Sequence, residues 1–170
     1  NVRLIGPQNS DVLANGDFEA TTLSPWYAQG RPANGAAATL SKDSGQSGSG
    51  SAKVSISNPG ANPWDIQLVH ENVPMTAGKR YTLSFWAKAS QARAAEVFLQ
   101  QFDAPFTVPW TQALTLGEGW QQYAYTFDYP PSAPTATPSF RVNLGQLGGA
   151  VWFDAISLCE AAAQPPPPTP

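Results

Sequence analysis

The segment between residues 62 and 68 combines a stiffened aromatic residue with polar groups on one face of a strand. Pro63 fixes its own φ and biases the preceding residue toward an extended conformation, so Trp64 is presented from a rigid loop. The alternation that follows places Asp65 and Gln67, with Val69, on the strand face opposite Ile66 and Leu68. The apolar face of a pyranose packs on an indole, and its hydroxyl groups bind carboxylates and amides. The segment therefore predicts sugar recognition; the alternative is that Trp64 closes one end of the core.

Two further segments, 96–102 and 139–144, alternate in the same way. One sheet face is predicted to gather the polar side chains of all three segments: Gln67, Gln100, Arg141 and Asn143, with Glu96 as a possible fifth member. The alternative is an ordinary solvated face, but such faces usually favour Lys, Glu and Thr. Planar amides both donate to and accept from hydroxyl groups, which favours a sugar-binding surface.

Phe106 lies between Pro105 and Pro109 and repeats the arrangement of Trp64, an aromatic ring held by prolines in a loop. It is predicted to be a second stacking platform. Trp110, which follows Pro109, either extends this platform or fills the end of the core; the second interpretation is favoured.

Carboxylates in two separate segments suggest a calcium site. Asp17 and Glu19 flank a phenylalanine in a turn, and Asp154 lies within an apolar strand, where a charge must be paired, hydrogen-bonded or metal-bound. Calcium binds carboxylate and carbonyl oxygens, and the Gly45–Ser51 loop offers carbonyls. In the alternative, Asp17 only caps its turn and Asp154 pairs with a cation, Lys53 or Arg80. The residues alone leave both open.

The residues offer little for catalysis. His70 is the single histidine and is expected at the exposed end of a strand, without a nucleophile elbow nearby. One histidine and one cysteine are too few for a zinc site. A glycosidase needs two paired carboxylates, and no pair can be assigned from the sequence. A small glycan hydrolase or lyase remains the alternative function.

The 170 residues are rich in proline, glycine and short alternating segments, which predicts an all-β sandwich of the jelly-roll type. The compact module is expected over 1–161 and a proline-rich linker over 162–170.

Only 12% of the residues are charged and the net charge is −3, so no nucleic-acid partner is expected. No apolar run of about 18 residues is present to span a membrane. Strand signals occur at 4–5, 12–13, 37–40, 52–56, 66–69, 81–87, 96–102, 120–129, 139–144 and 151–158.

Taken together, these motifs resemble carbohydrate-binding modules of family 4 and the related families 9 and 22. The likeness covers most of positions 10–160. It rests on six motifs in this order: Leu13–Glu19 followed by Pro25-Trp26, Gly50–Val54, Asn62–Gln67, Gly78–Ala89 and Phe153–Leu158.

The resemblance implies a jelly roll that binds single glycan chains in a cleft on its concave sheet, without catalysis of its own. It assigns Trp64 and Phe106 to sugar stacking, and Gln67 and Asn143 to hydrogen bonding on the cleft floor. It also implies a structural calcium ion held by Asp17, the Gly50 carbonyl and Asp154, with Glu19 as a further ligand. A secreted bacterial module is expected, monomeric and covalently linked to a glycoside hydrolase. It would bind β-1,4-linked polysaccharide, xylan first and β-glucan second.

Overall fold

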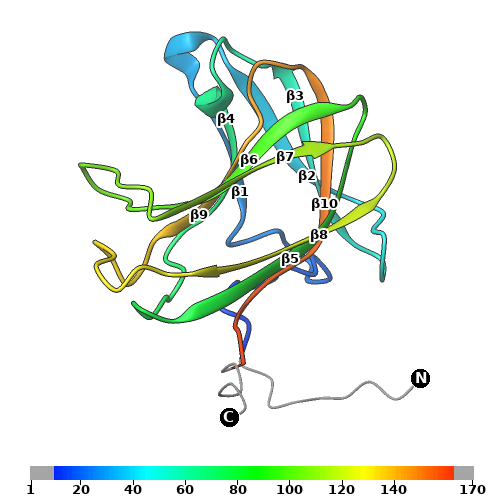
Figure 1. Cartoon of the computed structure of the whole chain (residues 1–170). Coiled ribbons are helices and arrows are strands. Elements are labelled where there is room, and N and C mark those ends of the chain that lie inside the picture. The colour runs from blue at the N-terminus through cyan, green and yellow to red at the C-terminus, as the bar shows by residue number, and fades with distance from the viewer. Residues whose placement is uncertain (1–9, 163–170) are drawn as a thin grey trace.

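The computed structural model describes residues 10–162, which form two antiparallel five-stranded sheets packed face to face (Figure 1). The front sheet contains, in spatial order, β1 (Tyr27–Gly30), β4 (Ile66–His70), β9 (Ser139–Asn143), β6 (Arg93–Gln100) and β7 (Trp110–Leu116). The back sheet contains β2 (Ala37–Asp43), β3 (Ser51–Asn58), β10 (Gly149–Glu160), β5 (Arg80–Ala89) and β8 (Gln121–Asp128). Two short 3₁₀ turns, η1 (Pro32–Asn34) and η2 (Pro63–Asp65), precede β2 and β4.

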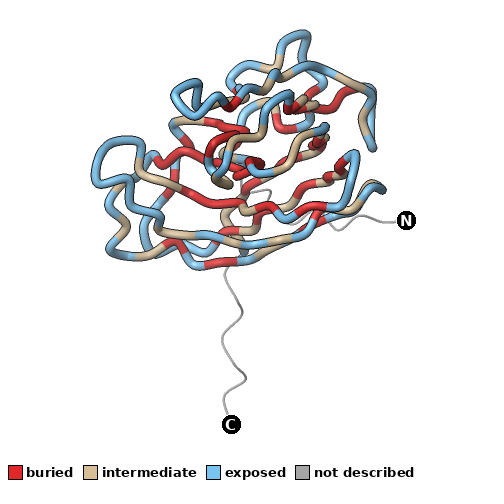
Figure 2. The backbone as a smooth tube through the Cα atoms, turned by 90° about the horizontal axis from the view of Figure 1, so that it is seen from above, coloured by how far each residue is buried: buried red, intermediate tan, exposed pale blue. Residues whose placement is uncertain are grey.

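The core lies between the two sheets because apolar residues alternate along the strands of both (Figure 2). The core-facing residues of the central strands include Leu68, Val97, Leu99, Phe140 and Val142 on the front sheet, and Val54, Leu83, Phe85, Val151 and Phe153 on the back sheet. Trp110 stacks on Phe127 with ring centroids 4.0 Å apart and packs against this core. The predicted all-β jelly-roll sandwich and the core position of Trp110 are confirmed.

The strand prediction was incomplete at the edges of the front sheet. β1 and β7, which form its two edges, were not predicted. β1 has only four residues, and β7 alternates exposed Thr111, Ala113 and Thr115 with half-buried positions, so neither strand has a strong apolar alternation. Segment 12–13, predicted as a strand, is irregular backbone, although the Val12 N–H donates to the Leu158 carbonyl. Segment 4–5 and all but the first residue of the predicted 162–170 linker lie outside the described residues.

His70 is buried, so the prediction of an exposed strand-end histidine was wrong. Its Nε2 accepts a hydrogen bond from the Ala14 N–H, and its Nδ1 lies 2.9 Å from the Glu71 carbonyl. The ring packs edge-on against Trp26, whose indole N–H donates to the Ala14 carbonyl. Burial lowers the pKa of the imidazole. His70 therefore fastens the N-terminal segment to β4 in its neutral form and is not available for catalysis.

Among residues 10–162, no helix is long and apolar enough to cross a membrane.

Candidate functional site

Trp64 is presented by η2, the short turn that leads into β4. Asp65 closes this turn: its carboxylate accepts hydrogen bonds from the Ala61 and Asn62 N–H groups and from the Asn34 amide. These bonds, led by the one from Asn62, lower the pKa of Asp65. Asp65 is 0% exposed, so it is not the cleft-facing carboxylate that the alternation predicted. It holds the loop instead, because the strand alternation starts only at Ile66.

The Trp64 side chain is 48% exposed, which excludes the alternative that it closes the core. It stands at the side of a cleft of about 510 Å³ on the face of the front sheet that points away from the core. The cleft is lined by Arg31, Trp64, Gln67, Glu96, Phe98, Gln100, Val108, Thr111 and Asn143. The predicted amide-rich face is therefore real, and the carboxylate it contains is Glu96.

The floor of the cleft is one continuous chain of hydrogen bonds that crosses four strands. Arg141 Nη1 donates to Gln67 Oε1 at 2.8 Å, and Gln67 Nε2 donates to Asn143 Oδ1 at 2.7 Å. Asn143 Nδ2 donates to Glu96 Oε2 at 2.8 Å, and the Thr111 hydroxyl donates to Glu96 Oε1 at 2.7 Å. The chain forms because Gln67, Asn143 and Glu96 occupy directly opposed positions on β4, β9 and β6.

The direction of this chain is set by its two ends. Arg141 can only donate hydrogen bonds, and an ionised Glu96 can only accept them. Gln67 must therefore turn its oxygen toward Arg141, and Asn143 must turn its amide nitrogen toward Glu96. In these bonds each amide uses one of its two N–H groups, so the second remains for a ligand. The floor thus offers N–H donors of known orientation beside a carboxylate acceptor.

Arg141 lies at the buried end of the chain, with 8% of its surface exposed. Burial lowers the pKa of its guanidinium, and hydrogen bonds to three oxygen acceptors offset the cost of burying the charge. Besides Gln67, these are Gln29 Oε1 at 3.0 Å and the Ser139 hydroxyl at 2.8 Å. Arg141 therefore lies beneath the cleft surface, where it orients Gln67.

Phe106 and Gln100 lie at the β6 end of the cleft. Phe106 is 55% exposed in the loop between β6 and β7, and its φ of 56° turns the backbone sharply. Gln100 lines the cleft, and its amide donates to the Phe106 carbonyl at 3.2 Å. The Phe106 ring is not among the side chains that line the cleft, so its role in sugar stacking stays a prediction.

Several cleft residues were not predicted: Arg31, Phe98, Val108 and Thr111. Phe98 lies on β6 two residues from both Glu96 and Gln100, so it shares their strand face, and it forms an apolar part of the floor. Thr111 belongs to the unpredicted edge strand β7. Arg31 comes from the connection after β1, and its Nε donates to the Trp64 carbonyl. Only the tertiary structure brings this residue to the cleft.

The predicted calcium ligands lie at the far side of the sandwich, where the loop between β2 and β3 covers β10. Asp154 is fully buried; its Oδ2 accepts the N–H groups of Gln46 and Ser47, and its Oδ1 has no hydrogen-bond partner among residues 10–162. Glu19 Oε1 accepts the N–H groups of Ser49 and Gly50 of the same loop.

The glycines of this loop allow a close approach of oxygen atoms. A Cβ on Gly45 would lie 2.4 Å from the Gly50 carbonyl oxygen and 2.9 Å from Asp154 Oδ2. A Cβ on Gly50 would lie 2.2 Å from the Phe18 carbonyl oxygen. Asp154 Oδ1, a buried carboxylate oxygen without a hydrogen-bond partner among residues 10–162, and the closely packed backbone carbonyls of this loop are oxygen donors of the kind that calcium prefers.

The structure tests the ion-pairing and turn-capping alternatives for Asp154 and Asp17. Neither proposed cation pairs with Asp154, because Lys53 pairs with Asp43 and Arg80 with Asp128. Asp17 is exposed and caps its turn, with Oδ1 accepting the Glu19 N–H, and its role as a metal ligand stays a prediction. Within residues 10–162, no three acidic, histidine or cysteine side chains cluster as a metal site. Any ion here therefore depends on backbone carbonyls.

A rigid exposed indole beside a cleft floored by oriented amides defines a glycan-binding β-sandwich. Residues 10–148 match the family described as carbohydrate binding domain, which groups families 4 and 9. The chain belongs to this family. It is a carbohydrate-binding domain and not a catalytic one, and the sequence-based resemblance is confirmed.

Individual relatives agree with this assignment. Endoglucanase C of Cellulomonas fimi is 29% identical over 122 residues, which cover 67% of this chain but only 11% of that protein. A solved family 4 carbohydrate-binding module superposes with a TM-score of 0.75 at 24% identity, covering 88% of this chain and 99% of that one. A family 22 xylan-binding domain from Paenibacillus barcinonensis has a TM-score of 0.68 at 13% identity, covering 94% and 100%. These two structural likenesses concern the fold.

Proposed function

We propose that the cleft binds single chains of β-1,4-linked polysaccharide, with xylan preferred and β-glucan second. The observation that supports this most directly is the pairing of the exposed Trp64 ring with the oriented chain of Gln67, Asn143 and Glu96. The indole packs on the apolar face of one sugar ring. The amide N–H groups and the carboxylate then bind hydroxyl groups along the chain.

The position of the polar groups favours a separated chain over a crystalline surface. Gln67 and Asn143 are almost fully buried on the cleft floor, while Trp64 is exposed above it. A chain must enter the cleft to reach both, and chains packed in a crystal cannot do so. A binder of crystalline cellulose would need a flat aromatic surface instead.

The proposal is tested by calorimetry with xylo-oligosaccharides and cello-oligosaccharides of increasing length, alongside adsorption to crystalline cellulose. Affinity should rise with length until the cleft is filled and then become constant, and adsorption should be absent. Tight adsorption to crystalline cellulose without binding of soluble oligosaccharides would contradict the proposal.

We also propose a structural calcium ion at the loop between β2 and β3. Asp154, Glu19 and the carbonyl of Gly50 would hold it, with Asp17 as the fourth predicted ligand. The ion would supply positive charge for the unpartnered oxygen of Asp154 and would fix the loop onto β10. It would have no part in sugar binding, because the cleft lies on the other sheet.

We propose that this domain is a secreted bacterial monomer that, outside the cell, keeps a linked glycoside hydrolase close to its polymer. The match to part of an endoglucanase supports the link. Tethering raises the effective concentration of the catalytic domain at the polymer surface without new contacts. Comparing hydrolysis of insoluble xylan by such a hydrolase with and without this domain tests the role, and light scattering of the isolated domain tests the monomer.

A further inference from the structure

The outer face of the back sheet carries a row of alternating tryptophan and lysine side chains. Lys53, Trp152 and Lys88 occupy directly opposed positions on β3, β10 and β5. Lys53 Nζ lies 5.1 Å and Lys88 Nζ 4.9 Å from the centre of the Trp152 ring. Lys88 Nζ also lies 5.0 Å from the centre of the ring of Trp120, the residue that precedes β8. Each distance is within the range of a cation–π contact.

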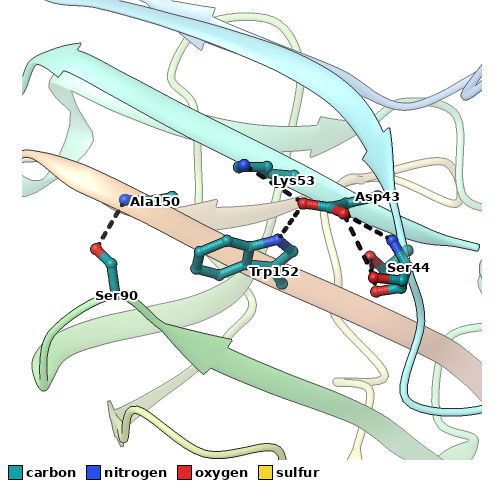
Figure 3. Close-up of polar contacts among 7 residues, drawn as sticks. Asp43, Ser44, Lys53, Ser90, Ala150 and Trp152 are labelled. Carbon is teal, nitrogen blue, oxygen red and sulfur yellow. Dashed lines mark hydrogen bonds and ion pairs between the residues drawn. The ribbon is translucent and has the colours of Figure 1, made fainter.

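The two lysines differ in their charge balance. Lys53 is paired with Asp43 at 3.3 Å, and the same carboxylate accepts the Trp152 indole N–H at 2.9 Å (Figure 3). Hydrogen bonds from the Trp152 indole N–H, the Ser44 N–H and the Lys53 ammonium group lower the pKa of Asp43 to about 2. Asp43 is therefore ionised and neutralises Lys53. None of the ion pairs among residues 10–162 includes Lys88, whose ammonium group lies against two indole rings.

A hollow of about 470 Å³ adjoins this row on the same face. Its walls carry hydroxyl groups and one ammonium group: they are formed by Thr39, Lys53, Ser55, Ile56, Ser57, Ser90, Gly149 and Ala150. The hollow exists because small residues, Ser55 and Ala150, occupy opposed positions beside the bulky pair of Lys53 and Trp152. Ser90 is fixed at its edge, with its hydroxyl accepting the Ala150 N–H (Figure 3).

We propose that this outer face is a second glycan-binding site, distinct from the cleft, for polysaccharides that carry uronic acid carboxylates. The carboxylate pairs with Lys88, the cation of the row that has no acid partner among residues 10–162. The sugar hydroxyl groups bind the serine and threonine side chains of the hollow, and the indole edges provide apolar contact.

The charge of the row argues for an acidic sugar over a neutral one. The two lysines and Asp43 leave a net charge of +1 on a protein whose overall charge is −3. Lysines already lie over the Trp152 ring, so it offers a neutral sugar less open aromatic surface than Trp64 does. Lys88 is held in place by both rings, so little side-chain entropy is lost when it binds a carboxylate.

The experiment uses the double variant Trp64→Ala/Phe106→Ala, which impairs the cleft and leaves the back sheet unchanged. Oligogalacturonate and its neutral methyl ester are titrated into this variant, and the indole N–H signals are followed by NMR. The Trp120 and Trp152 signals should shift with oligogalacturonate only. Binding should weaken as sodium chloride is raised, because the contact is an exposed ion pair.

Lys88→Gln in the same background should weaken binding about tenfold, while Lys88→Arg retains it. Lys79→Gln, at the opposite end of β5, changes the net charge equally and should have little effect. Absent binding, equal binding of the methyl ester, or equal loss in the Lys88→Gln and Lys79→Gln variants would each overturn the proposal. None of these outcomes depends on whether xylan or β-glucan fills the cleft.

Discussion

Trp64 on the front sheet and Trp152 on the back sheet are both indoles beside polar side chains, yet their surroundings differ. The Trp64 side chain is exposed on a turn, and the cleft floor beside it carries two neutral amides, bonded into a chain that ends at Glu96. Trp152 has a lysine on each neighbouring strand close to its ring, and its indole N–H donates to Asp43. The first arrangement leaves an aromatic face open to a sugar ring, whereas the second uses that face to position ammonium groups.

The comparison shows that an aromatic residue type alone does not decide what a surface binds. The cleft has a recessed, directional floor, which favours neutral hydroxyl groups. The outer face presents a cation, which favours charged ligands and is screened by salt. The following predictions test this difference, in order of decreasing effect.

Trp64→Ala should weaken binding of neutral xylo-oligosaccharides roughly tenfold to a hundredfold, by loss of one stacking contact. Trp152→Ala is the matched control on the other sheet and should leave this affinity unchanged. Both are measured by calorimetry, with melting curves to establish that each variant is folded. Equal losses in the two variants would remove the distinction between the faces.

Calcium removal should affect stability and leave the cleft intact. An ion bound only by the folded chain adds about 2.7 kcal/mol at a hundredfold excess over its dissociation constant. The melting temperature should fall with chelator and recover with calcium, while sugar affinity at low temperature stays constant. Asp154→Asn should abolish the calcium response. Identical melting curves with and without chelator, after verified metal removal, would contradict the calcium proposal.

Gln67→Ala and Asn143→Ala should each weaken sugar binding by about 1 kcal/mol, or fivefold, because each interrupts the chain between Arg141 and Glu96. They should also shift the preference between xylan and β-glucan. Gln122→Ala removes an exposed amide from β8 of the back sheet and serves as the control. Calorimetry with both oligosaccharide series provides the measurement. A cleft insensitive to both changes would show that Trp64 alone determines affinity.

The smallest effect concerns His70, which belongs to neither face. Its pKa in the folded protein is lowered by burial below the ordinary value of 6.5, so the unfolded chain takes up a proton first as pH falls. Its contribution to stability is therefore complete above pH 6.5 and is lost as pH falls through the folded pKa. Because this is the single histidine, its ring signals give that pKa directly by NMR. A value at or above 6.5 would contradict the prediction.

Much of the cleft could be predicted because strand alternation is a local property. The pattern in segments 66–69, 96–102 and 139–144 placed Gln67, Gln100, Arg141 and Asn143 on one face, and the structure confirms this. The pattern failed at Asp65, which lies one residue before the strand and turns into the loop. It also failed for His70, because a neighbouring segment covers the strand end.

By itself, the sequence determined the sandwich, the alternation of its core and the presence of an aromatic residue beside an amide-rich face, since these follow from residue type and a period of two. Only the tertiary structure decided the register that opposes Gln67, Asn143 and Glu96 and so joins them in one directional chain. It also decided the row of Lys53, Trp152 and Lys88. Strand pairing joins residues far apart in the chain, and its register depends on how all ten strands among residues 10–162 pack together.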